Sequence, residues 1–101
     1  MENDMPTFII AINWTDQGIR TVKDSPKRRD AAKELAKKVG VDLKQVYLTT
    51  GEHDLLVIAE APQMDNVTKL ALALGSMGNV RTSTSVAWTE PEWTKLISEL
   101  P

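Results

Sequence analysis

The sequence has no cysteine and a single histidine among its 101 residues. Without thiols it has no disulfide framework, no thiolate nucleophile and no zinc ribbon. One histidine leaves only scattered carboxylates as metal ligands, so we expect neither a metal site nor a cofactor. The Gly-x-Ser-x-Gly motif is also missing, and no serine has a recognisable base at motif spacing, which argues against covalent catalysis.

Long hydrophobic runs and an excess of one charge are missing as well. No apolar stretch is long enough for a membrane span or a signal-peptide core. Twelve Lys and Arg stand against fourteen Asp and Glu, for a net charge of -2. This balance gives no dominant attraction to phosphate backbones or anionic lipids. We therefore predict a cytoplasmic protein that binds neither nucleic acid nor membrane.

The residues that are present suffice for one hydrophobic core. With 42% hydrophobic residues, the chain has the size and composition of a single domain. We expect residues 1–5 to form a flexible leader and residues 6–101 to form the domain. A chain this short buries only about two-thirds of its unfolded surface, so association would add useful stability.

The apolar pattern predicts strands and helices in a recognisable order. Strand, helix, strand, strand, helix, strand is the split βαβ order of the ferredoxin-like fold, an α+β sandwich with a four-stranded antiparallel sheet. A further helix capped by Thr89 and Glu92 follows. The expected strands span residues 7–14, 41–50, 53–60 and 80–88, and the expected helices span 15–22, 25–40 and 63–77.

The first and third strands are apolar at consecutive positions, which indicates central strands covered on both faces. Phe8, Ile10 and Ile12 lie on one side of the first strand, and Ile9 and Ala11 lie on the other. Two helices can cover only one face of such a sheet.

The second face could be covered by the terminal helix of the same chain or by a second copy. We predict a homo-oligomer in which two sheets stack around a two-fold axis. In this arrangement Trp93, Leu96 and Leu100 of the terminal helix brace the partner.

Three separated segments resemble the GYD-domain family. They are Asn13–Gly18 (NWTDQG), Gly51–Asp54 (GEHD) and Leu74–Thr82 (LGSMGNVRT), and the similarity spans roughly residues 6 to 100. His53 stands where the family usually has tyrosine. The resemblance implies a ferredoxin-like domain of the dimeric α+β barrel type, and it leaves the activity open because that of the family is largely uncharacterised.

His53 and Asp54 are the candidates for proton transfer, because the only histidine of the chain stands beside a carboxylate at a turn. Adjacent residues of a strand, however, point to opposite faces of the sheet. We therefore favour a turn role for His53 over a catalytic His-Asp pair.

Asn13, Trp14 and Asp16 are the first candidates for ligand binding, because they lie where the first strand meets the first helix. Alternatively, Trp14 belongs to the core and Asp16 stabilises a helix terminus. Arg81 could receive an anionic ligand, but we favour pairing of Arg81 with Asp54 or Glu60 across neighbouring strands.

The leading functional hypothesis is a homo-oligomeric module that binds a small ligand or regulates another protein. The alternatives are a cofactor-poor enzyme of the monooxygenase or isomerase kind, with His53, Asp54, Asn13 and Arg81 in a cavity, and a purely structural assembly subunit. Convergence of those four side chains around an enclosed void would favour the enzyme, whereas mutual pairing or solvent exposure would disfavour it.

Overall fold

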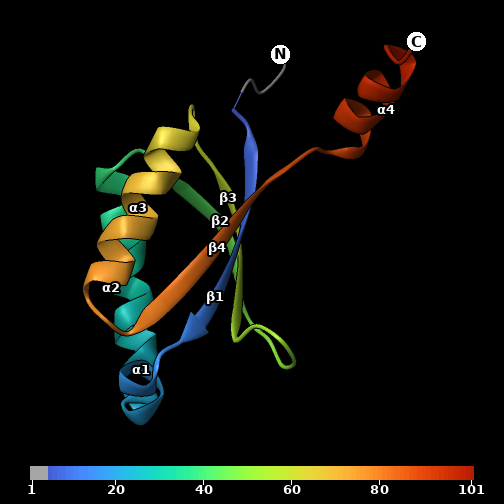
Figure 1. Ribbon diagram of the computed structural model, residues 1–101. Coiled ribbons are helices and arrows are strands. Elements are labelled where there is room, and N and C mark those ends of the chain that lie inside the picture. Colours follow the sequence, from blue (N-terminus) through green and yellow to red (C-terminus); the bar gives the residue numbers. More distant parts are fainter. Residues whose placement is uncertain (1–4) are drawn as a thin grey trace.

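The computed structural model describes residues 5–101 and has a ferredoxin-like α+β fold (Figure 1). Its sheet has the order β2-β3-β1-β4, and every neighbouring pair of strands is antiparallel. Residues 1–4 of the expected leader lie outside the described residues. The elements are β1 (Thr7–Trp14), α1 (Asp16–Arg20), the 3-10 turn η1 (Val22–Asp24), α2 (Ser25–Lys38), β2 (Asp42–Leu48), β3 (Leu55–Glu60), α3 (Met64–Ser76), β4 (Val80–Ala87) and α4 (Glu90–Ser98).

The two consecutively apolar strands, β1 and β3, occupy the centre of the sheet, as the sequence predicts. Ile10 pairs with Val57 on one side and with Thr84 on the other. Alternate residues of β1 and β3 point toward the helices and form the core with side chains from α2 and α3. The buried core residues are Phe8, Ile10, Ile12, Ala36, Val41, Val57, Ala59, Ala61, Val67 and Leu70.

Helices α2 and α3 cover one face of the sheet (Figure 1). Helix α2 begins at Ser25, the first residue of the expected segment 25–40, with Asp24 in the N-cap position. Gly40, with φ of +82°, ends this segment in a conformation that suits glycine. Asn66 of α3 donates a hydrogen bond of 3.0 Å to the carbonyl of Val39, which fixes the start of α3 against the end of α2.

None of the helices within residues 5–101 lies over the opposite face of the sheet. Strand alternation places Ile9, Ala11, Leu56 and Ile58 on this open face, and each is only partly buried. Among residues 5–101, no helix is both long and apolar enough to cross a lipid bilayer.

Helix α4 does not cover the open face of its own chain, so that alternative from the sequence is wrong. The chain continues past the end of the sheet through the exposed Trp88 and carries α4 away from the other elements (Figure 1). All residues of α4 are exposed. The radius of gyration is 14.9 Å, compared with about 13 Å for a compact domain of this length, as a projecting helix requires.

Candidate functional site

The polar residues singled out in the sequence gather where β1 ends and the loop before β3 begins. Asn13 donates a hydrogen bond of 2.8 Å from Nδ2 to the carbonyl of Glu52. Its Oδ1 lies 2.8 Å from Nδ1 of His53. An amide oxygen can only accept a hydrogen bond, so in this contact Nδ1 of His53 carries the proton.

Asp54 bonds to the backbone rather than to His53. Its Oδ2 accepts a 2.9 Å hydrogen bond from the backbone N–H of Trp14, and its own N–H donates to the carbonyl of Ile12 at 3.0 Å. Within residues 5–101, His53 and Asp54 share no hydrogen bond. Asp54 therefore holds the end of β1 against the 49–54 loop, and the geometry does not form a His-Asp dyad.

The third family-like segment joins the same end of the domain. Thr15 caps α1 by accepting from the N–H of Gly18 at 3.1 Å, and its hydroxyl donates to the carbonyl of Gly78. Gln17 donates to the carbonyl of Met77 at 3.1 Å and to Oδ1 of Asn79 at 3.0 Å. The three segments that carry the resemblance thus form one hydrogen-bonded network that connects β1, α1 and two loops.

Asp16 and Arg81 stand apart from this network. Both are exposed, and neither has a side-chain hydrogen bond or ion pair within residues 5–101. The expected pairing of Arg81 with Asp54 or Glu60 is wrong. Within residues 5–101 the carboxylate of Asp54 bonds to the N–H of Trp14, and the register places Arg81 opposite Asn13, whereas Glu60 lies opposite Thr7. The four residues of the enzyme hypothesis are therefore paired or exposed, and they do not surround a common void.

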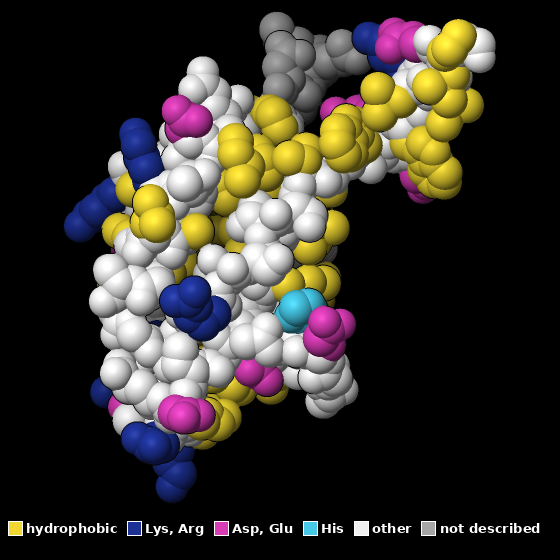
Figure 2. All heavy atoms as spheres, in the orientation of Figure 1, with side chains coloured by type: hydrophobic (Ala, Val, Ile, Leu, Met, Phe, Trp, Pro, Cys, Tyr) yellow, Lys and Arg dark blue, Asp and Glu magenta, His cyan; other side chains and the backbone are white. Residues whose placement is uncertain are grey.

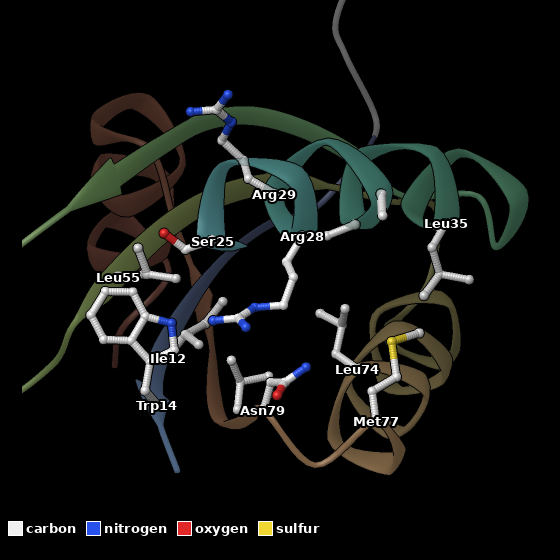
Figure 3. A pocket seen from close by; sticks show the side chains of 13 residues that line it. Ile12, Trp14, Ser25, Arg28, Arg29, Leu35, Leu55, Leu74, Met77 and Asn79 are labelled. Carbon is white, nitrogen blue, oxygen red and sulfur yellow. The ribbon is translucent and has the colours of Figure 1, made fainter. Parts of the chain in front are cut away.

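A different hollow lies beside this network, between α2, α3 and the sheet (Figure 3). We call it the α2–α3 cavity. Its volume is about 170 Å³, and of the expected ligand-binding residues it includes Trp14. Its other apolar lining residues are Ile12, Ala31, Ala32, Leu35, Leu55, Leu74, Met77 and Val80.

Arg28 and Arg29 both line the α2–α3 cavity, and the guanidinium of Arg28 is the one directed into it (Figure 3). Its Nη1 donates to the carbonyl and hydroxyl of Thr21 at 3.2 and 2.8 Å, and its Nη2 donates to the carbonyl of Gly18 at 3.0 Å. Arg28 was not among the candidate residues predicted from the sequence. A signal was available, because Arg28 lies four residues before Ala32 and seven before Leu35, on the apolar stripe of α2.

No group of three or more His, Asp or Glu side chains within residues 5–101 is arranged to hold a metal ion. The polar groups of this region are hydrogen-bond partners in a folded network and one arginine in an apolar cavity. Such an arrangement suits binding better than proton transfer or metal-assisted chemistry.

A comparison with protein families shows to which family this chain belongs. The model of the GYD domain matches residues 8–97, which is nearly the whole chain. The chain belongs to the GYD domain family. Its three family-like segments, dispersed in the sequence, are therefore one network in this GYD fold, with His53 bonded to Asn13.

A protein of Thermus thermophilus named glutamine synthetase and cystathionine beta-lyase binding protein is similar to this GYD protein in sequence. The two are 35% identical over 81 residues, which cover 79% of this chain and 85% of the relative. The name of that relative describes a protein that binds two enzymes.

Two solved structures from Mycobacterium tuberculosis have the same fold. The leucine response regulatory protein matches with a TM-score of 0.60 and 18% identity over 83% of this chain. The feast or famine regulatory protein, in complex with L-methionine, matches with a TM-score of 0.55 and 16% identity over 85% of this chain. The matched regions cover 51% and 52% of those structures, so this chain spans about half their length, and the likeness concerns the fold alone.

Proposed function

We propose that this GYD protein is a homo-oligomeric regulatory module that works by binding other proteins. Helix α4 is the observation that carries the proposal. Its apolar side chains gather on a segment that stands away from the sheet (Figure 2). Trp93, Leu96, Ile97 and Leu100 are 59%, 45%, 55% and 65% exposed.

A helix such as α4 needs a surface to pack against. It has nine residues, whereas isolated helices shorter than about 12–15 residues are marginal in water. Its capping box, in which Thr89 and Glu92 bond to each other's backbone N–H, supports only its first turn. Since α4 contributes nothing to the core of its own chain, a partner is the natural source of its packing.

The open sheet face is suited to a second copy of the same chain. Two cross-strand pairs of β1 and β3 form its centre, Ile9 with Ile58 and Ala11 with Leu56. None of these four residues is charged. Beside them on β4 lie two small neutral residues, Ser83 and Ser85. A two-fold interface places identical surfaces against each other, so a neutral apolar centre avoids the repulsion that a charged one would create.

The projecting helix is placed to extend this contact. In Figure 1, α4 lies on the side of the sheet opposite α2 and α3, which is the side where a second sheet would stack. Two copies related by a two-fold axis could therefore exchange their α4 helices across the open faces. The apolar surfaces of both elements would then be covered by one assembly.

The test is the mass of the native protein in solution, measured by light scattering and sedimentation equilibrium. We expect a dimer or a larger even-numbered assembly for the full chain, and a monomer for the double variant Trp93→Asp, Leu96→Asp. The matched control is Leu72→Asp on α3, since Leu72 is 69% exposed but lies away from both surfaces. A monomeric full chain, or an assembly that the double variant leaves intact, would contradict the proposal.

Binding of a metabolic enzyme is the second candidate function, and the Thermus relative favours it. The 35% identity over most of both chains supports a protein-binding role for this chain as well. The direct test is to pass two purified enzymes over the immobilised protein. The enzymes are glutamine synthetase and cystathionine beta-lyase from the organism that encodes this chain. Saturable binding of either enzyme would support this candidate function. If neither enzyme binds, this candidate function is contradicted.

The alternatives from the sequence are less well supported. The enzyme alternative needs His53, Asp54, Asn13 and Arg81 in one cavity, and their pairing and exposure disfavour it. A purely structural subunit would need no cavity beside its core, yet the α2–α3 cavity is present. A cytoplasmic location remains part of the proposal, in keeping with a regulator of metabolic enzymes.

A further inference from the structure

From the α2–α3 cavity we infer a binding site for a small apolar monocarboxylate. The carboxylate would pair with Arg28, and its hydrocarbon part would fill the apolar hollow. This goes beyond the proposed function, because self-association through the open face and α4 does not involve the cavity.

The charge of Arg28 is the first step of the argument. Within residues 5–101, no carboxylate lies within ion-pair distance of its guanidinium. Its hydrogen bonds go to a hydroxyl and two carbonyls of Thr21 and Gly18, which orient it without neutralising it. A partly buried cation among apolar walls is costly unless an anion accompanies it.

The donors that remain on Arg28 suit a carboxylate. A guanidinium has five N–H groups, and the three bonds to Thr21 and Gly18 leave the Nε–H and one Nη2–H without a partner in the described chain. These two atoms lie on the same edge of the guanidinium plane. Parallel donors of this kind match the two oxygens of a carboxylate in a bidentate pair.

Asn79 adds a further donor on the opposite wall. Its Oδ1 accepts a hydrogen bond from Gln17, whereas Nδ2 makes no hydrogen bond within residues 5–101 and is directed into the cavity (Figure 3). Among the described residues, no Asp or Glu lines the cavity. It therefore offers donors for an anion and no counter-charge for an ammonium group, so a carboxylic acid fits better than a zwitterionic amino acid.

The volume limits the size of the ligand. A dry cavity of about 150 Å³ lined by aliphatic side chains is known to hold benzene, and the α2–α3 cavity measures about 170 Å³. A phenyl ring or a branched chain of similar size would fill it. Trp14 closes one side of the hollow, with Leu35 and Met77 at the other (Figure 3).

The experiment titrates the ¹⁵N-labelled full chain with four probes followed by NMR. Benzoate and 4-methylpentanoate carry the carboxylate, benzyl alcohol lacks it, and L-leucine adds an ammonium to the 4-methylpentanoate skeleton. We expect the two acids to shift the amides of residues lining the cavity and to bind at least about tenfold more tightly than benzyl alcohol or leucine.

Three variants locate the effect. Arg28→Met should weaken benzoate binding at least about tenfold, whereas the matched control Arg20→Met should not, because Arg20 is exposed on α1 and is not among the residues that line the cavity. Arg28 also ties α1 to α2, so Ala32→Leu provides an independent test. It fills the cavity without changing charge and should abolish binding of both acids.

Equal affinities for benzoate and benzyl alcohol, or for 4-methylpentanoate and leucine, would overturn the inference. So would equal effects of the two arginine variants, or shifts located elsewhere in the chain. If Arg28→Met does not fold, the probe comparison on the unmodified chain and the Ala32→Leu result decide the question. Mass measurements on the same samples keep this test separate from that of self-association.

Discussion

Gly18 of α1 packs directly against the backbone of Asn79 in the loop before β4. A Cβ built on Gly18 would lie 2.0 Å from the carbonyl oxygen of Asn79. The same oxygen accepts a hydrogen bond of 3.1 Å from the N–H of Thr15, so it cannot move away freely. We expect Gly18→Ala to destabilise the fold by about 3 kcal/mol, measured by urea denaturation.

Gly75 in α3 provides the matched control for this prediction. A Cβ at Gly75 would meet nothing within 4 Å, and the residue lies inside a helix. Alanine has the higher helix propensity, so Gly75→Ala should stabilise the protein by about 0.5 kcal/mol. Equal destabilisation by both substitutions would mean that the contact with Asn79 is not the cause.

Asp54 should stabilise the fold through its hydrogen bond with the backbone N–H of Trp14. Asp54→Ala removes the acceptor of the partly buried Trp14 N–H, which should cost about 1–3 kcal/mol in unfolding free energy. Asp54→Asn keeps an oxygen acceptor and should cost less. Asp16→Ala, at an exposed position, should change stability by only about 0.5 kcal/mol. A harmless Asp54→Ala would show that water replaces the lost acceptor.

The start of α4 should depend on pH through Glu92. Hydrogen bonding, first with the backbone N–H of Thr89 and then with its side chain, lowers the pKa of Glu92 below its ordinary value of 4.5. A carboxyl whose folded pKa is lowered stabilises the fold above its unfolded pKa, and this contribution is lost as pH falls through the folded value. Acidification should therefore fray the first turn of α4.

Cα chemical shifts of residues 90–98, followed from neutral to acidic pH, measure this fraying. Glu92→Gln is the control, because its amide oxygen can still accept from Thr89 but has no proton to gain in this range. The variant should lack the acid transition at the first turn. A transition of the same size in both proteins would assign it to other carboxylates.

Much of the fold could be predicted from local pattern. Continuous apolar residues in β1 and β3, against alternation in β4, were sufficient to identify the central strands, because only central strands of a half-covered sheet are apolar on both sides. The capping box of Thr89 and Glu92 likewise predicted the start of α4. These features depend on residues close together in the chain.

The site was less predictable because it depends on register and on three distant segments. His53 and Asp54 lie in the loop before β3, where they bond to different partners, and no sequence pattern states that Asn13 meets His53, 40 residues away. The register also separates Arg81 from Glu60, a pair that seemed plausible from strand order alone. Arg28 was not among the candidates from the sequence, although its spacing belongs to the apolar stripe of α2.

The path of α4 could not be predicted from its amphipathic pattern, since the same stripe suits packing on its own sheet or on another chain.

The open face of the sheet provides the sharper test of self-association. Ile58 lies at its centre, paired with Ile9, and is partly exposed in the single chain. Ile58→Lys should therefore leave the monomer fold nearly intact but bring like charges together in a stacked pair.

We expect Ile58→Lys to dissociate the assembly while the far-UV circular dichroism stays unchanged, and Leu72→Lys on the helical side to leave the mass unaltered. Partial recovery of the assembly at high salt would support repulsion between the two lysines, because screening weakens exposed like-charge contacts. If Ile58→Lys keeps the native mass while the α4 variants lose it, the copies associate through α4 alone, and the stacked sheets must be abandoned.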